Sequence, residues 1–332
     1  MFAKIEASAM TRMVFLFALL VTTFVCLLPA VPARAQAART FVSAAGSDSN
    51  NCINVATPCR HFAAAYAATA ADGEIDVLDP ANYGALIISQ GISIQGHGWA
   101  SLSAVGGGAS ITINAGGKIN ISGVILDGGG AANSTGIQFN GSGGTLSVRD
   151  SVIRNFGGDG IAFQPNSSGL SQLFVSNTLV SDSGNNGINI SPSGSGTTAC
   201  VLDHVELENN GTVGVSASST TQSINVTVSD SVSANNGGAG ISTPNPTLGQ
   251  GIVAAVGRPQ VNIPVVSVMV RNSTIANNNT GVLTQLGTIS ITRSTIIDNF
   301  NTSFGAVSSY QDNNIVGNSN DAAPPVVPIG YK

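Results

Sequence analysis

The residues best suited to chemistry gather in one short stretch of the chain. Asp203, His204, Glu206 and Glu208 lie within six positions, and Asp230 follows His204 by 26 residues. Nowhere else in the sequence do a histidine and several carboxylates stand so close together. Carboxylates within reach of one another can act as acid and base on a glycosidic bond, or can hold Ca²⁺. Asp203, His204 and Asp230 are therefore catalytic candidates, and Glu206 and Glu208 are substrate-binding candidates.

Arg154 forms the second candidate group. A lyase acting on uronic acids needs a cation to neutralise the carboxylate and a base to remove the neighbouring proton. Arg154 stands near Asp150 and one repeat after Asp127, which makes it the most lyase-like arginine and adds it to the catalytic candidates. The same residues also fit an exposed ion pair worth at most about 1 kcal/mol. Arg149, Tyr83 and Trp99 complete the substrate-binding candidates, and further aromatic residues available for sugar stacking are Phe156, Phe163 and Phe174.

An internal repeat determines which elements position these residues. Gly160-Ile161, Gly187-Ile188, Gly214-Val215 and Gly240-Ile241 recur 27, 27 and 26 residues apart. Each follows a polar turn residue by ten positions, and each turn follows a short alternating apolar run. A fixed period of this length indicates one coil per repeat. Several short strands and no helix per repeat predict an all-β, right-handed parallel β-helix of about nine to ten coils, with Val, Ile and Leu filling its interior.

Aligned coils place polar residues in two columns. The first reads Gly123, Asp150, Asn177, His204, Asp230, Asn272, Arg293, and the second reads Gly128, Asn155, Asp182, Asn209, Asn235, Asn277. Asn, Asp and Gly tolerate the left-handed backbone of a tight turn, and stacked Asn side chains can hydrogen-bond from coil to coil. The second column is therefore expected to be structural, and the same structural role is open to most of the first.

The two ends of the coil differ from its middle. Residues 36–79 contain a strand, a loop bounded by Cys52 and Cys59, and an Ala-rich stretch over 58–71 that predicts a helix ending at Asp72-Gly73. We expect a disulfide between Cys52 and Cys59 and an N-terminal cap over the first coil. The unpaired Cys200 fits a small buried side chain. The β-helix is expected over 80–318, with a Pro-rich side loop at 243–264 and a loose tail at 319–332.

The N-terminal segment has the pattern of a signal peptide. Lys4 and Arg12 precede an apolar run of 16 residues, which is followed by Ala33-Arg34-Ala35. The run is shorter than the 18 or more residues of a spanning helix, so we expect cleavage after residue 35 and an exported protein without a membrane anchor. Cleavage leaves nine basic and sixteen acidic residues, a net charge of −7. Such a chain lacks the basic surface that nucleic acid binding requires.

The mature chain resembles the right-handed parallel β-helix proteins of the pectate lyase-like superfamily. More narrowly, residues 39–95 resemble the N-terminal region of exported bacterial β-helix proteins. The residues that carry this resemblance are Arg39-Thr-Phe-Val42, Gly46, Asp48, Cys52, Pro58-Cys59, Phe62, Gly73-Glu74-Ile75 and Ile92-Ser-Ile94. Gly96-His97-Gly98 matches the Gly-His-Gly of polygalacturonases but lacks paired aspartates upstream, and the calcium-binding aspartates of pectate lyases are not recognisable. The resemblance implies a polysaccharide partner, by analogy of fold.

Three functions stay open at this point. The protein interacts with polysaccharide without evident catalysis, or it is a lyase or glycosidase acting on a glycan that contains uronic acid, or it is a structural protein or adhesin of the surface or matrix. No cofactor is required by the sequence, although Ca²⁺ remains possible at the carboxylates. The sequence leaves the glycan, the metal requirement and the oligomeric state undetermined.

Overall fold

Alternating apolar and polar residues place more than half of the described chain in β-strands. The structure is a computed structural model that describes residues 36–104, 106–219, 221–237, 250–256, 266–284, 287–304, 307–319 and 321. The expected signal peptide, and the tail apart from 319 and 321, lie outside these residues. Within the described part, no helix is long and apolar enough to cross a membrane.

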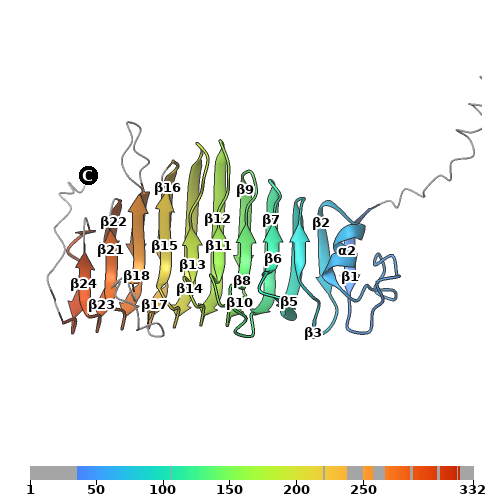
Figure 1. The fold of residues 1–332 in the computed structure, drawn as a ribbon, viewed down its shortest axis with the longest axis horizontal. Coiled ribbons are helices and arrows are strands. Elements are labelled where there is room, and N and C mark those ends of the chain that lie inside the picture. Colours follow the sequence, from blue (N-terminus) through green and yellow to red (C-terminus); the bar gives the residue numbers. More distant parts are fainter. Residues whose placement is uncertain are drawn as a thin grey trace, which may run out of the picture. The chain divides into compact units, whose positions relative to one another are not determined.

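The strands stack as the coils of a parallel β-helix, in one row with helix α2 at its N-terminal end (Figure 1). One sheet has nine strands: β4 (Leu86–Ile88), β6 (Ala109–Ile113), β8 (Thr135–Phe139), β11 (Ile161–Phe163), β13 (Ile188–Ile190), β15 (Val213–Ser219), β18 (Gln250–Val256), β21 (Thr280–Thr284) and β24 (Asn301–Phe304).

The other sheet has seventeen strands and bends at a turn, so that it forms two ladders. The first ladder holds β1 (Ala37–Val42), β2 (Thr69–Val77), β9 (Gly144–Arg149), β16 (Ser223–Ser229), β19 (Val266–Arg271), β22 (Thr288–Thr292) and β25 (Val307–Ser309). The second holds β3 (Ala81–Asn82), β10 (Val152–Arg154), β17 (Val232–Ala234), β20 (Thr274–Ala276), β23 (Thr295–Ile297) and β26 (Asn314–Val316). Four long strands contribute to both ladders: β5 (Ile92–Ser103), β7 (Lys118–Asp127), β12 (Leu170–Ser181) and β14 (Thr197–Glu208).

Two turns of each regular coil are made by a single residue in the left-handed conformation. The residues at these turns come from the two polar columns. The first turn joins the two ladders, and its residues have φ between 46° and 65°: Gly123, Asp150, Asn177, His204, Asp230, Asn272, Arg293. The second turn follows the second ladder, with φ between 54° and 59°: Asn155, Asp182, Asn209, Asn235, Asn277, Asp298. Gly128 departs from the expected column, because Gly129 and Gly130 take the left-handed conformation in its place.

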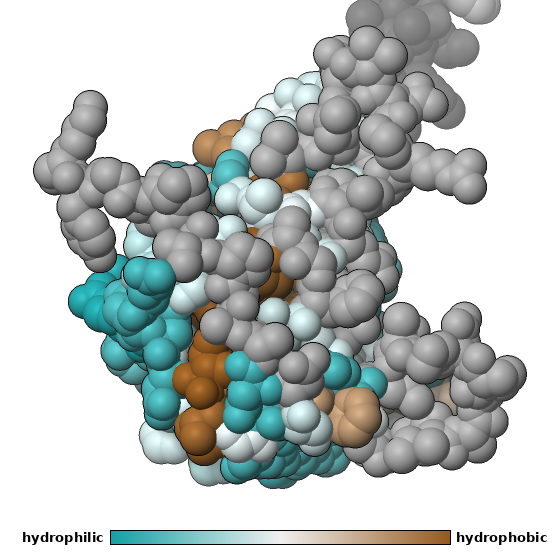
Figure 2. Space-filling model, turned by 90° about the vertical axis from the view of Figure 1, so that its left-hand side faces the viewer, coloured by the Kyte–Doolittle hydropathy of each residue, from teal (hydrophilic) through white to brown (hydrophobic). Residues whose placement is uncertain are grey.

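Strand periodicity fills the interior with apolar side chains. In the first ladder one inward column is at most 1% exposed: Ile94, Ile121, Val148, Val175, Leu202, Val228. Burying each such side chain stabilises the fold by about 1.5–3 kcal/mol. Seen from the end that carries the last coils, a band of apolar residues runs between hydrophilic ones (Figure 2). Cys200 is buried and unpaired, as expected, and burial raises the pKa of its thiol.

A buried ladder of asparagines lies one residue after the second turn. Asn210, Asn236, Asn278 and Asn299 are at most 3% exposed, and Asn318 is 7% exposed. From Asn236 onward, each side-chain oxygen accepts the backbone N–H and side-chain amide of the previous member, as Asn236 does from Asn210 at 3.1 and 3.0 Å. Each amide also donates to a strand carbonyl, as Asn236 does to Leu207 at 3.2 Å. The ladder therefore satisfies turn amides that would otherwise be buried without partners.

The N-terminal cap keeps its expected disulfide between Cys52 and Cys59. Its helix is shorter than predicted: α2 covers Phe62–Ala68, and residues up to Asp72 belong to strand β2. The cause is tertiary, because β2 pairs in parallel with β1 and then with β5. Ladder hydrogen bonds thus override the helix propensity of the Ala-rich stretch.

The prediction of a side loop over 243–264 is wrong for its middle residues. Gln250–Val256 form strand β18, which pairs with β15 and β21 and so belongs to the coil itself. All four prolines of the region, at 244, 246, 259 and 264, flank this strand. Its backbone N–H groups are therefore free to join the ladder. The other residues of the region lie outside the part that the structure describes.

Candidate functional site

Asp203 and His204 form a hydrogen-bonded pair where strand β14 bends. Nδ1 of His204 lies 3.0 Å from Oδ2 of Asp203, and the Ser229 hydroxyl of the next coil donates to Oδ1 of Asp203 at 2.6 Å. The two side chains are 35% and 60% exposed, Asp203 being the more covered. His204 can occupy this turn because histidine is among the residues that accept a left-handed backbone.

The pair fixes the direction of the imidazole. Hydrogen bonds from the Ser229 hydroxyl and from His204 hold the pKa of Asp203 below its usual value. Asp203 is then an ionised carboxylate, which only accepts hydrogen bonds, so Nδ1 of neutral His204 must carry the proton. Nε2 keeps its lone pair and faces away from Asp203, as a base that a carboxylate orients.

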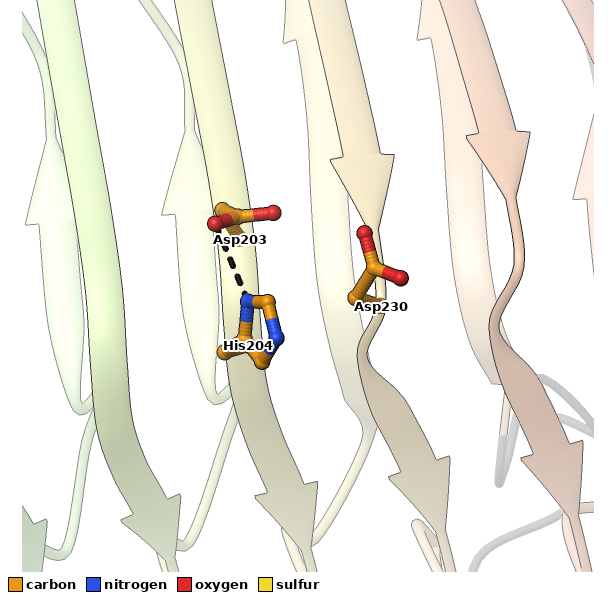
Figure 3. Close-up of side chains that lie close together, drawn as sticks. All are labelled: Asp203, His204 and Asp230. Carbon is orange, nitrogen blue, oxygen red and sulfur yellow. Dashed lines mark hydrogen bonds and ion pairs between the residues drawn. The ribbon is translucent and has the colours of Figure 1, made fainter.

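Asp230 joins this pair from the first turn of the next coil. One ligand atom from each of Asp203, His204 and Asp230 lies within 4.8 Å of the others (Figure 3). Asp230 is itself held by the side-chain amide of Asn272, one coil further. The structure thus brings together three of the four predicted catalytic residues.

The donor set of this group fits Ca²⁺ poorly. Ca²⁺ takes six to eight oxygen ligands, whereas two carboxylates and one imidazole are offered, and Asp203 is already engaged with Ser229 and His204. An imidazole with carboxylates is the donor set of Zn²⁺ and similar metals. Such an ion would be held only weakly, because His204 is exposed and Asp203 and Asp230 are only partly buried.

An open depression of about 530 Å³ lies next to the pair. It is lined by Asp150, Ser151, Val152, Asn177, Thr178, Leu179, His204 and Glu206. Glu206 therefore shares a surface with His204. Glu208 lies two residues further along β14, in register with Ser181 and away from this depression.

From Gln95 to Thr292, the residues just before the first turn alternate from coil to coil between large charged or amide side chains and smaller hydroxyl side chains; Asp76, which pairs with Gln95 one coil earlier, does not follow this alternation. In order along the coils they are Gln95, Ser122, Arg149, Ser176, Asp203, Ser229, Arg271 and Thr292. Coils are about 4.8 Å apart, so the large side chains recur about every 10 Å. Arg149 and Arg271 thus stand two coils on either side of Asp203. We call this set the outer row.

The two arginines of the outer row are exposed. The Arg149 guanidinium lies 5.1 Å from the centre of the Phe174 ring, and its Nε donates to Ser147 at 3.1 Å. Arg271 contributes to the lowered pKa of Asp203 through its charge. The regular size alternation is visible in the sequence only once the strand register is known, so inspection of single residues missed it.

Three predicted residues lie elsewhere. Arg154 is the last residue of strand β10 in the second ladder, and its Nε lies 3.0 Å from Asp127. It therefore forms the expected surface ion pair and does not belong to the Asp203 group. The expectation that Tyr83 contacts a sugar is wrong: it is fully buried against Phe62, and its hydroxyl donates to the Asp79 carbonyl at 2.6 Å. Trp99 is 44% exposed but belongs to β5, four coils before Asp203.

The comparisons with known proteins agree on the architecture. The structure of pectate lyase Pel9A matches over 89% of this chain and 83% of its own length, with a TM-score of 0.58 and 15% identity. A structure described as Geobacillus virus E2 ORF18 matches over 73% of this chain and 50% of its own length, with a TM-score of 0.51 and 12% identity. No family model and no curated protein matches the sequence. The chain therefore has a parallel β-helix fold, which the pectate lyase Pel9A structure shares.

Proposed function

We propose that the protein is exported and binds a linear polysaccharide along the outer row, with Asp203, His204 and Asp230 at the centre. The observation that carries this proposal is the alternation of large and small side chains every two coils. A linear polymer laid along the coil axis meets the same spacing repeatedly, whereas a small molecule would need one enclosed pocket. The Ser122 and Ser176 hydroxyls between the large side chains offer hydrogen bonds to sugar hydroxyls, whereas the buried Ser229 hydroxyl donates to Asp203.

The charges of the row favour a glycan that carries carboxylates. Arg149 and Arg271 are exposed cations on either side of the acidic centre, and arginine binds carboxylates in a bidentate manner. Pectate lyase Pel9A, which shares the fold, is named for action on pectate; this likeness supports the proposal by analogy. Export agrees with the Cys52–Cys59 disulfide, which is typical of oxidising compartments.

Binding is tested with the mature protein on an array of pectate, alginate and neutral-glycan hexamers, followed by calorimetry on the best ligand. We expect binding that Arg149→Gln and Arg271→Gln each weaken by about tenfold. The control is Arg154→Gln, because this arginine lies at the second turn. If no hexamer binds, the protein is not a polysaccharide-binding protein of these classes, and a structural role as spacer or adhesin takes its place.

The Asp203–His204 pair favours a lyase as the second candidate function. Nε2 of His204 is positioned to take a proton from a uronic acid, and Arg271 or Arg149 would neutralise the neighbouring carboxylate. A glycosidase is less well supported, because it needs a carboxyl group with a raised pKa as general acid, and the pKa of Asp203 is lowered. Ultraviolet-absorbing unsaturated products from pectate or alginate, lost in His204→Asn, would establish the lyase; their absence with the binding intact would exclude it for these substrates.

A further inference from the structure

The chain contains a single tryptophan, and it stands on a bulge at the N-terminal end of the outer row. In β5, Gln95 pairs with Ser122 and Ala100 with Val124, so the four residues 96–99 face the single residue Gly123. The bulge projects at the position of the first turn. It gives this coil side chains that the regular turns lack.

Gly123 makes room for the bulge. A Cβ on Gly123 would lie 2.7 Å from the backbone nitrogens of both His97 and Gly98, and Gly123 has a φ of 65°. Only glycine satisfies both conditions without strain.

The bulge carries an aromatic ring next to a polar pair. Nε2 of His97 lies 2.6 Å from Oδ1 of Asp76 in the previous coil, which fixes the imidazole. The Trp99 ring centre lies 5.9 Å from that of His97, at an angle of 52°. Trp99 is 44% exposed, whereas most aromatic side chains in the described residues are covered. Trp99 therefore presents part of its aromatic face to solvent, beside an imidazole that a carboxylate fixes.

The bulge also continues the two-coil alternation. Its strand residue Gln95 lies two coils before Arg149, at the same spacing that separates Arg149 from Asp203 and Asp203 from Arg271. The row thus has an aromatic end about 20 Å from Asp203. A polymer that follows the row toward the N-terminal cap would reach Trp99.

We propose that Trp99, His97 and Asp76 form an aromatic subsite that binds one pyranose ring of the polysaccharide chain lying on the outer row. The ring of Trp99 covers the apolar face of the sugar, and the free Nδ1 of His97 and the Asp76 carboxylate meet its hydroxyls. This inference rests on the proposed function. The subsite recognises the sugar ring by shape and does not depend on the charges of Arg149 and Arg271.

The single tryptophan makes the test direct, because intrinsic tryptophan fluorescence reports Trp99 alone. The probe is the hexamer that binds best on the array described above. On titration we expect a shift and an intensity change in the emission that saturate at the dissociation constant found by calorimetry. Trp99→Ala is expected to weaken binding by about tenfold, and Trp99→Phe by less, since an aromatic face remains.

Phe300→Ala is the matched control, since Phe300 is 64% exposed and lies outside the outer row. It should leave the affinity unchanged. If the hexamer binds by calorimetry while Trp99 emission stays constant and Trp99→Ala binds normally, the aromatic subsite is refuted and the proposed function stands. If no hexamer binds, both fail together.

Discussion

The two turns of each coil use the same backbone conformation and differ in what surrounds them. Both place one residue at a φ near 50°, and each borders an open depression of about 530 Å³. At the second turn the left-handed residues from Asn155 to Asp298 are all Asn or Asp, and from Asn209 onward each is followed by a member of the buried asparagine ladder. At the first turn the residues vary from Gly to His and Arg, and the large side chains of the outer row stand beside them.

The difference shows at which turn the left-handed position accepts many residue types and at which it accepts few. Where the ladder follows the second turn, a buried amide must satisfy backbone groups of the preceding coil and bond the next ladder amide, as Asn236 does with the Leu207 carbonyl and Asn278, so few residue types fit. At the first turn, a hydroxyl one position later satisfies the backbone, as the Ser231 hydroxyl accepts from Val205 N–H at 3.0 Å. The left-handed residue itself can then be chosen for another purpose. His204 and Arg293 are the clearest instances.

Removing one amide from the buried ladder should have the largest effect on stability. Asn236→Ala removes the acceptor of the Asn210 backbone N–H, one of the two acceptors of the Asn210 side-chain amide and a donor to the Leu207 carbonyl, and we expect the free energy of unfolding to fall by about 3 kcal/mol. Asn235→Ala is the control: it loses only left-handed tolerance, about 1 kcal/mol. Urea denaturation measures both, and equal losses would mean that the ladder is not what constrains the second turn.

Replacing the pair at the first turn should affect binding and leave stability nearly intact. Asp203→Asn together with His204→Asn keeps residues that tolerate the turn, and removes the charge and the imidazole. We expect affinity for the array-selected hexamer to fall by about tenfold. Asp182→Asn is the counterpart at the second turn, and calorimetry should find its affinity unchanged. A comparable loss in both variants would place the ligand on neither turn in particular.

The sequence predicts the coil well because repetition exposes it. The 27-residue period, the left-handed columns and the Cys52–Cys59 disulfide all follow from local chemistry that recurs. The register in which the strands pair could not be obtained from the repeat alone. Neither the two-coil alternation of the outer row nor the burial of Tyr83 is visible until strands are paired, and strand β18 was hidden by the prolines around it.

Relieving the backbone at Arg293 should stabilise the protein. Arginine is a poor residue for a φ of 47°, and the Arg293 side chain is exposed. Arg293→Gly removes the steric cost while the backbone N–H still donates to Asp312, so we expect a gain of about 0.5–1 kcal/mol. Asn277→Gly at the second turn should gain nothing, since asparagine already fits. Thermal denaturation compares them, and no gain at Arg293 would show that both turns are constrained alike.

The smallest expected effect is the contribution of Asp203 itself to stability. Its pKa is lowered in the folded state, first by the Ser229 hydroxyl and then by His204. A depressed carboxyl pKa stabilises the folded state above the unfolded value of about 3.9, and this contribution is lost as the pH falls through the folded pKa. Because the group is partly exposed, the contribution should stay below about 1 kcal/mol.

The stability of wild type over Asp203→Asn should therefore shrink as the pH falls below about 4, and Ser229→Ala should reduce the same pH dependence by removing its main cause. Urea midpoints across the acidic range measure this difference. A difference in the free energy of unfolding well above 1 kcal/mol would contradict the contrast between the turns, because side chains at the first turn would then stabilise the fold as much as those at the second. A small difference in stability agrees with a role of Asp203 in orienting His204 and binding the ligand.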